Sequence, residues 1–222
     1  MQNLNFQQVL RYQDEFMEGL LTTLQMTGIS ALFGLIIGIF GAVLLINGPK
    51  PIRILLKSYI EIIRNTPPLI QLFVIFFIFP SVGVRLSPFP AACVALSIYF
   101  GAYAIEIIRS GLNSIPKSQI EAGECLGLTR FEVFRFVILA PALRNIYPSL
   151  TSQLILLLLG TSVASQIAAT ELFHTGTFVE SRTFRSFEVY ALIAAIYVAV
   201  VIASRILFAA IGALAFRWPV RR

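Results

Sequence analysis

The sequence predicts an all-α membrane protein with five transmembrane helices, and its composition and hydropathy pattern support this fold class. Of the 222 residues, 57% are hydrophobic and 13% are charged, whereas a soluble domain carries about 25% charged residues. The apolar residues gather in five stretches of the length that crosses a bilayer. No hydrophilic stretch is long enough for a separate soluble domain, so residues 1–222 are expected to form one transmembrane domain.

Each candidate span holds about 20 mostly apolar residues, as a transmembrane helix requires. The five spans are Leu20–Ile46, Leu55–Phe79, Phe89–Ile108, Tyr147–Ala169 and Val189–Ala209. The first is longer than the apolar core of a signal peptide and no A-x-A site follows it, so we expect a retained helix. In the second, Pro67 and Pro68 remove two helix hydrogen bonds, which predicts a kink or break.

Lysine and arginine residues are distributed unevenly between the loops, and this predicts the orientation. One side holds Lys50, Arg53, Lys57, Arg109, Lys117, Arg130, Arg135, Arg144, Arg217, Arg221 and Arg222. The other side holds Arg11, Arg85, Arg182 and Arg185. The N-terminus is therefore expected outside and the C-terminus inside. These topology charges account for the net charge of +6, and no basic run with interleaved aromatic residues suggests nucleic acid binding.

A polar segment, at about residues 110–144, lies between the third and fourth spans and is expected in the cytoplasm. Ser118 with Glu121, and Thr129 with Glu132, have the S/T-x-x-E spacing of a capping box. Gly127 falls where a residue follows a helix C-terminus. Two short helices on a tight turn are predicted, the second ending at Pro141. Such a hairpin outside the bilayer is expected to dock onto a partner.

The same segment resembles the EAA loop of ABC importer permeases, which reads E-A-A-x-x-x-G and, about nine residues later, I-x-L-P. The matching residues are Glu121-Ala122-Gly123, Gly127 and Leu139-Ala140-Pro141. Gly123 departs from the second alanine, and Ala140 stands where leucine is common. Further segments are similar to the polar amino acid branch of this family: Arg64–Leu69, Glu106–Gly111, Ser114–Pro116 and Gly160–Ser162.

The resemblance implies a permease subunit in a bacterial cytoplasmic (inner) membrane, which moves an amino acid or similar small polar solute by alternating access. It implies three partners besides the lipid bilayer: ABC ATPase subunits, a second permease chain, identical or paralogous, and an extracytoplasmic solute-binding protein. The expected ATPase contact consists of Glu121, Ala122, Gly123 and Gly127.

The sequence contains no G-x-x-x-x-G-K-[ST] loop, so ATP hydrolysis is expected on a partner chain that carries ATP-Mg. We therefore expect a transport subunit, not an enzyme, without a cofactor of its own. Cys93 and Cys125 are isolated and His174 is the only histidine, so no metal site is expected either.

Polar residues in the second, third and fourth spans are candidates for the substrate path, because ionisable and polar groups in a bilayer usually face a bundle interior or water. The candidates are Gln71, Tyr103, Gly160, Thr161, Ser162, Ser165 and Gln166. Alternatively, Gln71 is an amide buried between helices and the hydroxyl residues serve close helix packing. Gly160 stands where relatives that handle charged amino acids often have an acidic residue, which argues against a lysine- or arginine-specific site.

Two further polar groups have alternative explanations. Lys57, Glu61 and Arg64 share one helical face, either as a structural ion network or as part of an inner gate. A polar rim on the predicted outside is expected to receive the binding protein, or else holds ordinary interfacial charges. It consists of Glu180, Arg182, Arg185 and Glu188.

The sequence argues against two other classes of protein. An ion-coupled carrier or channel would work without an ATPase and, as a carrier, often shows an internal repeat. No such repeat is visible, and the capped hairpin would have no role. A membrane enzyme would need a cluster of catalytic groups, and the sequence shows none.

Overall fold

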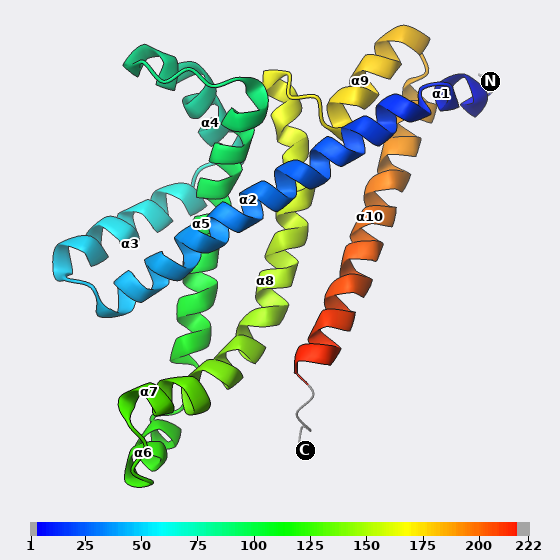
Figure 1. The fold of residues 1–222 in the computed structure, drawn as a ribbon. Coiled ribbons are helices and arrows are strands. Elements are labelled where there is room, and N and C mark those ends of the chain that lie inside the picture. Colours follow the sequence, from blue (N-terminus) through cyan, green and yellow to red (C-terminus); the bar gives the residue numbers. More distant parts are fainter. Residues whose placement is uncertain (1–3, 217–222) are drawn as a thin grey trace.

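The computed structural model describes residues 4–216, and all regular structure in this range is helical. Figure 1 shows a long tilted helix crossing a row of steeper ones. The helices in chain order are α1 (Phe6–Leu10), α2 (Gln13–Asn47), α3 (Lys50–Arg64), α4 (Pro68–Phe73), α5 (Pro88–Asn113), α6 (Lys117–Cys125), α7 (Arg130–Glu132), α8 (Ala140–Gly160), α9 (Leu172–Thr183) and α10 (Ser186–Ala215). The predicted all-α class is confirmed.

Shorter helical turns of other pitch join some of these helices. Two π-helical turns, η1 (Val74–Ile78) and η3 (Val133–Leu139), and two 3₁₀ turns, η2 (Phe79–Val82) and η4 (Thr161–Ile167), continue the helices beside them. The helix from Arg130 to Ile167 is continuous through α7, η3, α8 and η4.

Four helical stretches of the described chain are long and apolar enough to cross a membrane: α2, α5, the stretch Arg130–Ile167, and α10. A fifth span requires that α3 and the α4–η2 segment be counted as one, although they are bent by 110°. The predicted span Leu55–Phe79 is therefore not one straight helix. Pro67 and Pro68 break it, as the sequence predicted.

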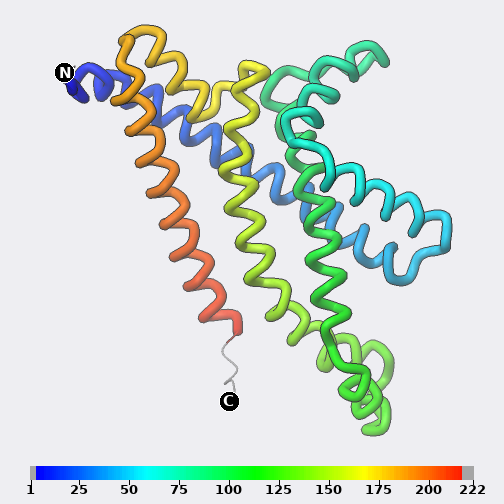
Figure 2. Tube along the Cα trace, turned by 180° about the vertical axis from the view of Figure 1, so that it is seen from behind, coloured from blue at the N-terminus to red at the C-terminus, as the bar shows by residue number. Residues whose placement is uncertain are grey.

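The helices α6, α7 and η3 form a hairpin. This hairpin lies at one end of the molecule, together with the described C-terminal end of α10, and we call this end the hairpin end (Figure 1). The N-terminal helix α1, α4 and α9 lie at the opposite end. Figure 2 shows the same arrangement from behind. The predicted orientation requires this separation of the termini. Three arginines used in that prediction, Arg217, Arg221 and Arg222, lie outside the described residues.

The packing of α2 against α5 forms the centre of the molecule, and small residues make it close. Gly34, Gly38 and Gly41 of α2 are all buried and recur at spacings of three and four residues, so they share one helical face. Ser30 extends this face and donates its hydroxyl to the carbonyl of Cys93, at 3.3 Å. Small residues allow backbones to approach in a membrane, where burial of apolar surface does not drive helix association.

A second core joins the helices at the opposite end. Val9 of α1, Phe16 of α2 and Leu172 of α9 pack against α10. Beyond this contact α10 buries few side chains, and aliphatic residues such as Ile206 stay exposed. This surface suits contact with lipid.

The hairpin confirms two local predictions and corrects two. Thr129 and Glu132 form both hydrogen bonds of the capping box, and Gly127 has a φ of 79°. Ser118 does not cap α6, because Pro116 occupies the N-cap position of this helix and no side chain forms a capping hydrogen bond there. Pro141 does not end the second helix. A proline ring clashes with the carbonyl four residues earlier in an α-helix, and the wider π-helical turn η3 comes directly before it.

Gly34→Ala tests the close contact of α2 with α5. An added Cβ would lie 2.6 Å from Cδ1 of Phe100 and 2.9 Å from the carbonyl oxygen of Ser97. We expect overpacking to cost about 1–3 kcal/mol and to lower the unfolding temperature in detergent. Gly28→Ala is the matched control on the same helix, because nothing lies within 4 Å of its Cβ position. Equal melting temperatures for both variants would contradict this packing.

Candidate functional site

A cluster of polar side chains lies where the broken helix meets α5 and α8. We call it the polar cluster. Contacts described below link Arg64, Tyr99, Tyr103 and Gln153, and we include Gln71 because it lies on α4, whose Pro68 borders a small space with Tyr99. The rings of Tyr99 and Tyr103 are 5.0 Å apart between centroids. The Arg64 guanidinium lies 5.3 Å from the centroid of the Tyr103 ring. Gln153 of α8 lies beside Tyr99, so the cluster joins three segments of the chain.

Gln71 holds the break between α3 and α4 together. Proline residues at 67 and 68 donate no N–H groups to the last turn of α3. The side-chain amide of Gln71 donates instead to the carbonyl oxygens of Ile63, at 2.8 Å, and Thr66, at 3.0 Å. This agrees with the interpretation of Gln71 as an amide buried between helices, and it uses both amide hydrogens.

Two polar atoms of the cluster have no hydrogen-bond partner among the described residues. They are Oε1 of Gln71 and Nε2 of Gln153, and both are buried. An unsatisfied buried group costs about 1–3 kcal/mol, so such atoms usually bind water or a ligand. The Gln71 oxygen is a hydrogen-bond acceptor and the Gln153 nitrogen is a donor. A zwitterionic solute would use an acceptor for its ammonium group and a donor for its carboxylate.

Gln153 is a polar residue of the cluster that the sequence pattern did not single out. It directly precedes the apolar run Leu154–Leu159, whereas the predicted path residues of this span lie in its other half. The polar run Thr151–Gln153 inside a predicted span was the available signal.

The predicted path residues do not form one group. Gln71 and Tyr103 belong to the polar cluster. Ser162, Ser165 and Gln166 line a separate pocket of about 270 Å³ with Leu69 and Phe173. The structure thus separates the candidates into an inner and an outer set.

The hydroxyls of the outer set have local partners. Ser162 and Ser165 donate to the carbonyls of Leu159 and Ser162, each at 2.8 Å. Thr161 is fully buried and donates to the carbonyl of Leu158, at 2.7 Å. Gly160 is half-exposed, and a Cβ there would meet nothing within 4 Å. Close helix packing in this chain therefore does not require glycine at position 160.

At the hairpin, the chain turns through a Schellman motif. The N–H of Leu128 donates to the carbonyl of Gly123, at 3.2 Å, and that of Gly127 donates to Glu124, at 2.9 Å. Glu121 and Ala122 are exposed, whereas Gly123 is buried against the second helix. Apolar side chains also stay exposed on the hairpin, notably Leu126 at 82% and Phe131 at 68%. Exposed apolar groups beside polar ones are typical of an interaction surface.

At the opposite end, the four rim residues differ in accessibility. Arg182 is exposed and lies 5.0 Å from the ring of Phe178. Glu180 accepts a hydrogen bond from the hydroxyl of Ser186, at 2.7 Å. Glu188 is 3% exposed; it accepts from the N–H of Asn5 and pairs with Arg185 at 3.4 Å. Glu188 therefore fixes the N-terminal segment and does not present its carboxylate at the surface.

Glu171 is a buried carboxylate that joins α9 to α10 at the same end. It caps α9 by accepting from the N–H groups of Phe173 and His174, each at 2.8 Å, and it accepts from the hydroxyl of Tyr197, at 3.1 Å. Burial raises the pKa of the Glu171 carboxyl above its usual range, although these hydrogen bonds act in the opposite direction. Next to it, the N–H of Leu172 donates to Thr23 of α2, at 3.1 Å.

Comparison with known proteins gives a consistent family assignment. Residues 34–217 match the family described as binding-protein-dependent transport system inner membrane component. The chain is 41% identical to the L-cystine transport system permease protein TcyB of Bacillus subtilis (strain 168), over 74% of this chain and 70% of that protein. It is 34% identical to the probable glutamine ABC transporter permease protein GlnM of the same organism, over 84% and 87%.

Solved structures agree with this assignment. An amino acid ABC transporter crystallised with histidines has a TM-score of 0.89 at 34% identity, covering 95% of this chain and 98% of that chain. A subunit of the inward-facing MetNI methionine ABC transporter, at 24% identity and a TM-score of 0.77, shares the fold over 92% of this chain and 98% of that chain. The chain therefore belongs to the family of ABC importer permease subunits. It is a transport component of the membrane, and the ATPase is a separate chain.

Glu171 predicts a pH dependence of stability. Because its pKa is raised in the folded state, this carboxyl stabilises the fold most below the ordinary glutamate pKa of about 4.3. That contribution is lost as the pH rises through the raised value. Glu171→Gln does not titrate, so the melting temperature of the wild type relative to this variant should fall as the pH is raised from about 4 to about 8.

Thermal unfolding in detergent across this range measures the effect. Glu124→Gln, at an exposed position on α6, controls for the removal of a negative charge. A difference between wild type and Glu171→Gln that stays constant with pH would contradict the assignment.

Proposed function

We propose that the chain forms part of the translocation path of a bacterial importer for a polar amino acid without net positive charge. The observation that carries this proposal is the polar cluster with its two unpaired atoms, Gln71 Oε1 and Gln153 Nε2. The relatives named for cystine and glutamine transport support an amino acid as substrate.

The cluster offers the groups that a zwitterion needs. The amide of Gln153 and the tyrosine hydroxyls can donate to a carboxylate, and the oxygen of Gln71 can accept from an ammonium group. No member of the cluster carries a carboxylate, and Arg64 adds a positive charge. A cationic side chain would have no anionic partner there and would meet repulsion from Arg64, so lysine and arginine should be poor substrates.

The remaining features extend this proposal to the whole complex. The chain lies in the cytoplasmic (inner) membrane as five spans, the bent pair α3–α4 counted as one, with the N-terminus outside. Two permease chains enclose the path, ATPase subunits that bind ATP-Mg drive alternating access, and this chain holds no cofactor. A solute-binding protein docks at the opposite end. Glu180, Arg182 and Arg185 lie there, and the buried Glu188 pairs with Arg185. Ser162, Ser165 and Gln166 line the path on that side.

The hairpin is the proposed ATPase contact. Glu121 and Ala122 present the exposed face of α6, while Gly123 and Gly127 set its position by close packing and by the turn. The exposed Leu126 and Phe131 add apolar surface beside them. A carrier or channel would leave this surface without a partner and would transport in the absence of ATP.

Gly127→Val tests the coupling role. The φ of 79° lies in the left-handed region, which costs a β-branched residue about 1–2 kcal/mol. We expect the second helix of the hairpin to be displaced, so that less ATPase co-purifies and transport in proteoliposomes falls. Gly127→Asn is the control, because asparagine tolerates this conformation. A Gly127→Val complex that assembles and transports like wild type would show that the hairpin is not the contact.

Cysteine labelling tests the path. In a background with Cys93 and Cys125 replaced by alanine, we expect Gln71→Cys, Gln153→Cys and Ser162→Cys to react with a water-soluble thiol reagent. Glutamine or cystine should slow labelling at positions 71 and 153, whereas lysine should not. Ala91→Cys, which is fully buried in the apolar core, is the unreactive control. Labelling at 71 and 153 no faster than at 91, or unaffected by any amino acid, would remove both residues from the path.

A further inference from the structure

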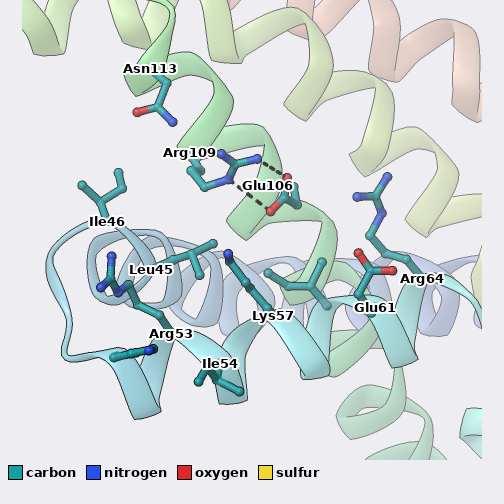
Figure 3. A pocket seen from close by; sticks show the side chains of 12 residues that line it. Leu45, Ile46, Arg53, Ile54, Lys57, Glu61, Arg64, Glu106, Arg109 and Asn113 are labelled. Atoms are coloured by element: carbon teal, nitrogen blue, oxygen red, sulfur yellow. Dashed lines mark hydrogen bonds and ion pairs between the residues drawn. The ribbon is translucent and has the colours of Figure 1, made fainter.

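A large cavity lies between the end of α2, α3 and the hairpin-end half of α5, and it shares only Arg64 with the polar cluster. Its volume is about 920 Å³. Figure 3 shows Arg53 and Lys57 on α3 and the Glu106–Arg109 pair on α5 facing the same space. We call it the basic cavity. The family assignment and the proposed path do not account for it.

The cavity carries an excess of positive charge. Its ionised lining residues are Lys50, Arg53, Lys57, Arg64 and Arg109, against Glu61 and Glu106. Arg109 is paired with Glu106 at 2.8 Å, and Arg64 lies over the Tyr103 ring. Glu61 accepts a hydrogen bond from Asn65, at 3.1 Å.

Three of these cations form a row. Lys50, Arg53 and Lys57 follow one another at spacings of three and four residues, so they share one face of α3. Among the residues that the structure describes, no carboxylate lies within 4.0 Å of their charged groups. Glu106 acts on Lys57 only at longer range, so the three neighbouring cations have no direct ion pair and repel one another. A bound anion would relieve this repulsion.

Apolar groups border the same cavity. Ile46 and Ile54 contribute to its lining. Ile54 is 55% exposed and its neighbour Leu55 is 69% exposed. A helix with cations on one side and aliphatic side chains on the other has the pattern typical of a membrane interface. A ligand that matches both surfaces has an anionic group and a hydrocarbon chain.

We propose that the basic cavity binds the headgroup phosphate of an anionic phospholipid from the leaflet at the hairpin end, with Lys50, Arg53 and Lys57 as its ligands and the acyl chains along Ile54 and Leu55. Basic pockets between transmembrane helices bind such headgroups in other membrane proteins. The apolar border favours a lipid over free phosphate, because a soluble anion would leave it uncovered. This site is independent of the transported solute and of the side on which the hairpin lies.

The experiment uses the intact complex, delipidated in detergent and titrated with phosphatidylglycerol or phosphatidylethanolamine, with native mass spectrometry counting bound lipid. We expect preferential binding of phosphatidylglycerol. The triple variant Lys50→Gln, Arg53→Gln, Lys57→Gln should weaken its binding on the order of tenfold or more. The matched control, Lys117→Gln with Arg130→Gln and Arg144→Gln, removes three exposed charges from the hairpin end and should bind like wild type.

Two further arms complete the test. The charge-preserving triple variant K50R, R53K, K57R should retain binding, and Arg53→Gln alone replaces the triple variant if that does not fold. Millimolar inorganic phosphate at constant ionic strength should not displace the lipid. Unchanged phosphatidylglycerol binding in the glutamine variants, or full displacement by inorganic phosphate, would overturn the proposal. Transport is not the readout, so failure of the proposed function would leave this result unaffected.

Discussion

Carbonyl groups that are freed inside an apolar environment need new donors, and the break between α3 and α4 meets this need with the side chain of Gln71. Both amide hydrogens of Gln71 satisfy carbonyls of the broken helix, which stabilises a bend of 110°. A break at this depth is tolerated only where protein or a cavity satisfies the backbone. Two consequences follow for the rest of the molecule. The oxygen of Gln71 is left without a hydrogen-bond partner among the described residues, and α3 is turned aside so that a space opens between it and α5.

The other helices form a frame that keeps this bend in place. Glycine residues of α2 bring its backbone close to α5, so neither helix can move toward the other. At the opposite end, Glu171 and Thr23 bind backbone N–H groups at the start of α9, where α2 and α10 meet. Between these regions, the hydroxyl of Tyr59 joins α3 to the carbonyl of Ile98 on α5, and that of Tyr147 joins α8 to the carbonyl of Phe208 on α10.

Local sequence rules correctly predicted the features that depend on only a few neighbouring residues. Hydropathy located the long helices, the spacing of Thr129 and Glu132 predicted a real capping box, and Gly127 adopts the left-handed conformation of a helix end. The errors arose where a competing group decides the outcome. Pro116 displaced Ser118 from the cap position, and a π-helical turn let the helix continue through Pro141. The contact of Gln153 with Tyr99 joins distant segments of the chain, and a helical pattern in one sequence does not contain such information.

Arg64 connects the two spaces that flank the broken helix. Its guanidinium lies over Tyr103 of the polar cluster and also lines the basic cavity. A fixed positive charge at this junction has opposite effects on the two sides. Toward the cluster it repels ammonium groups and favours the carboxylate of a zwitterion, and toward the cavity it adds to the field that attracts a phosphate. An anion bound in the cavity would in turn reduce the positive potential that reaches Tyr103, because the two spaces share this residue. If both proposed sites are occupied, Arg64 is the side chain through which the charge of the lipid would act on the polar cluster.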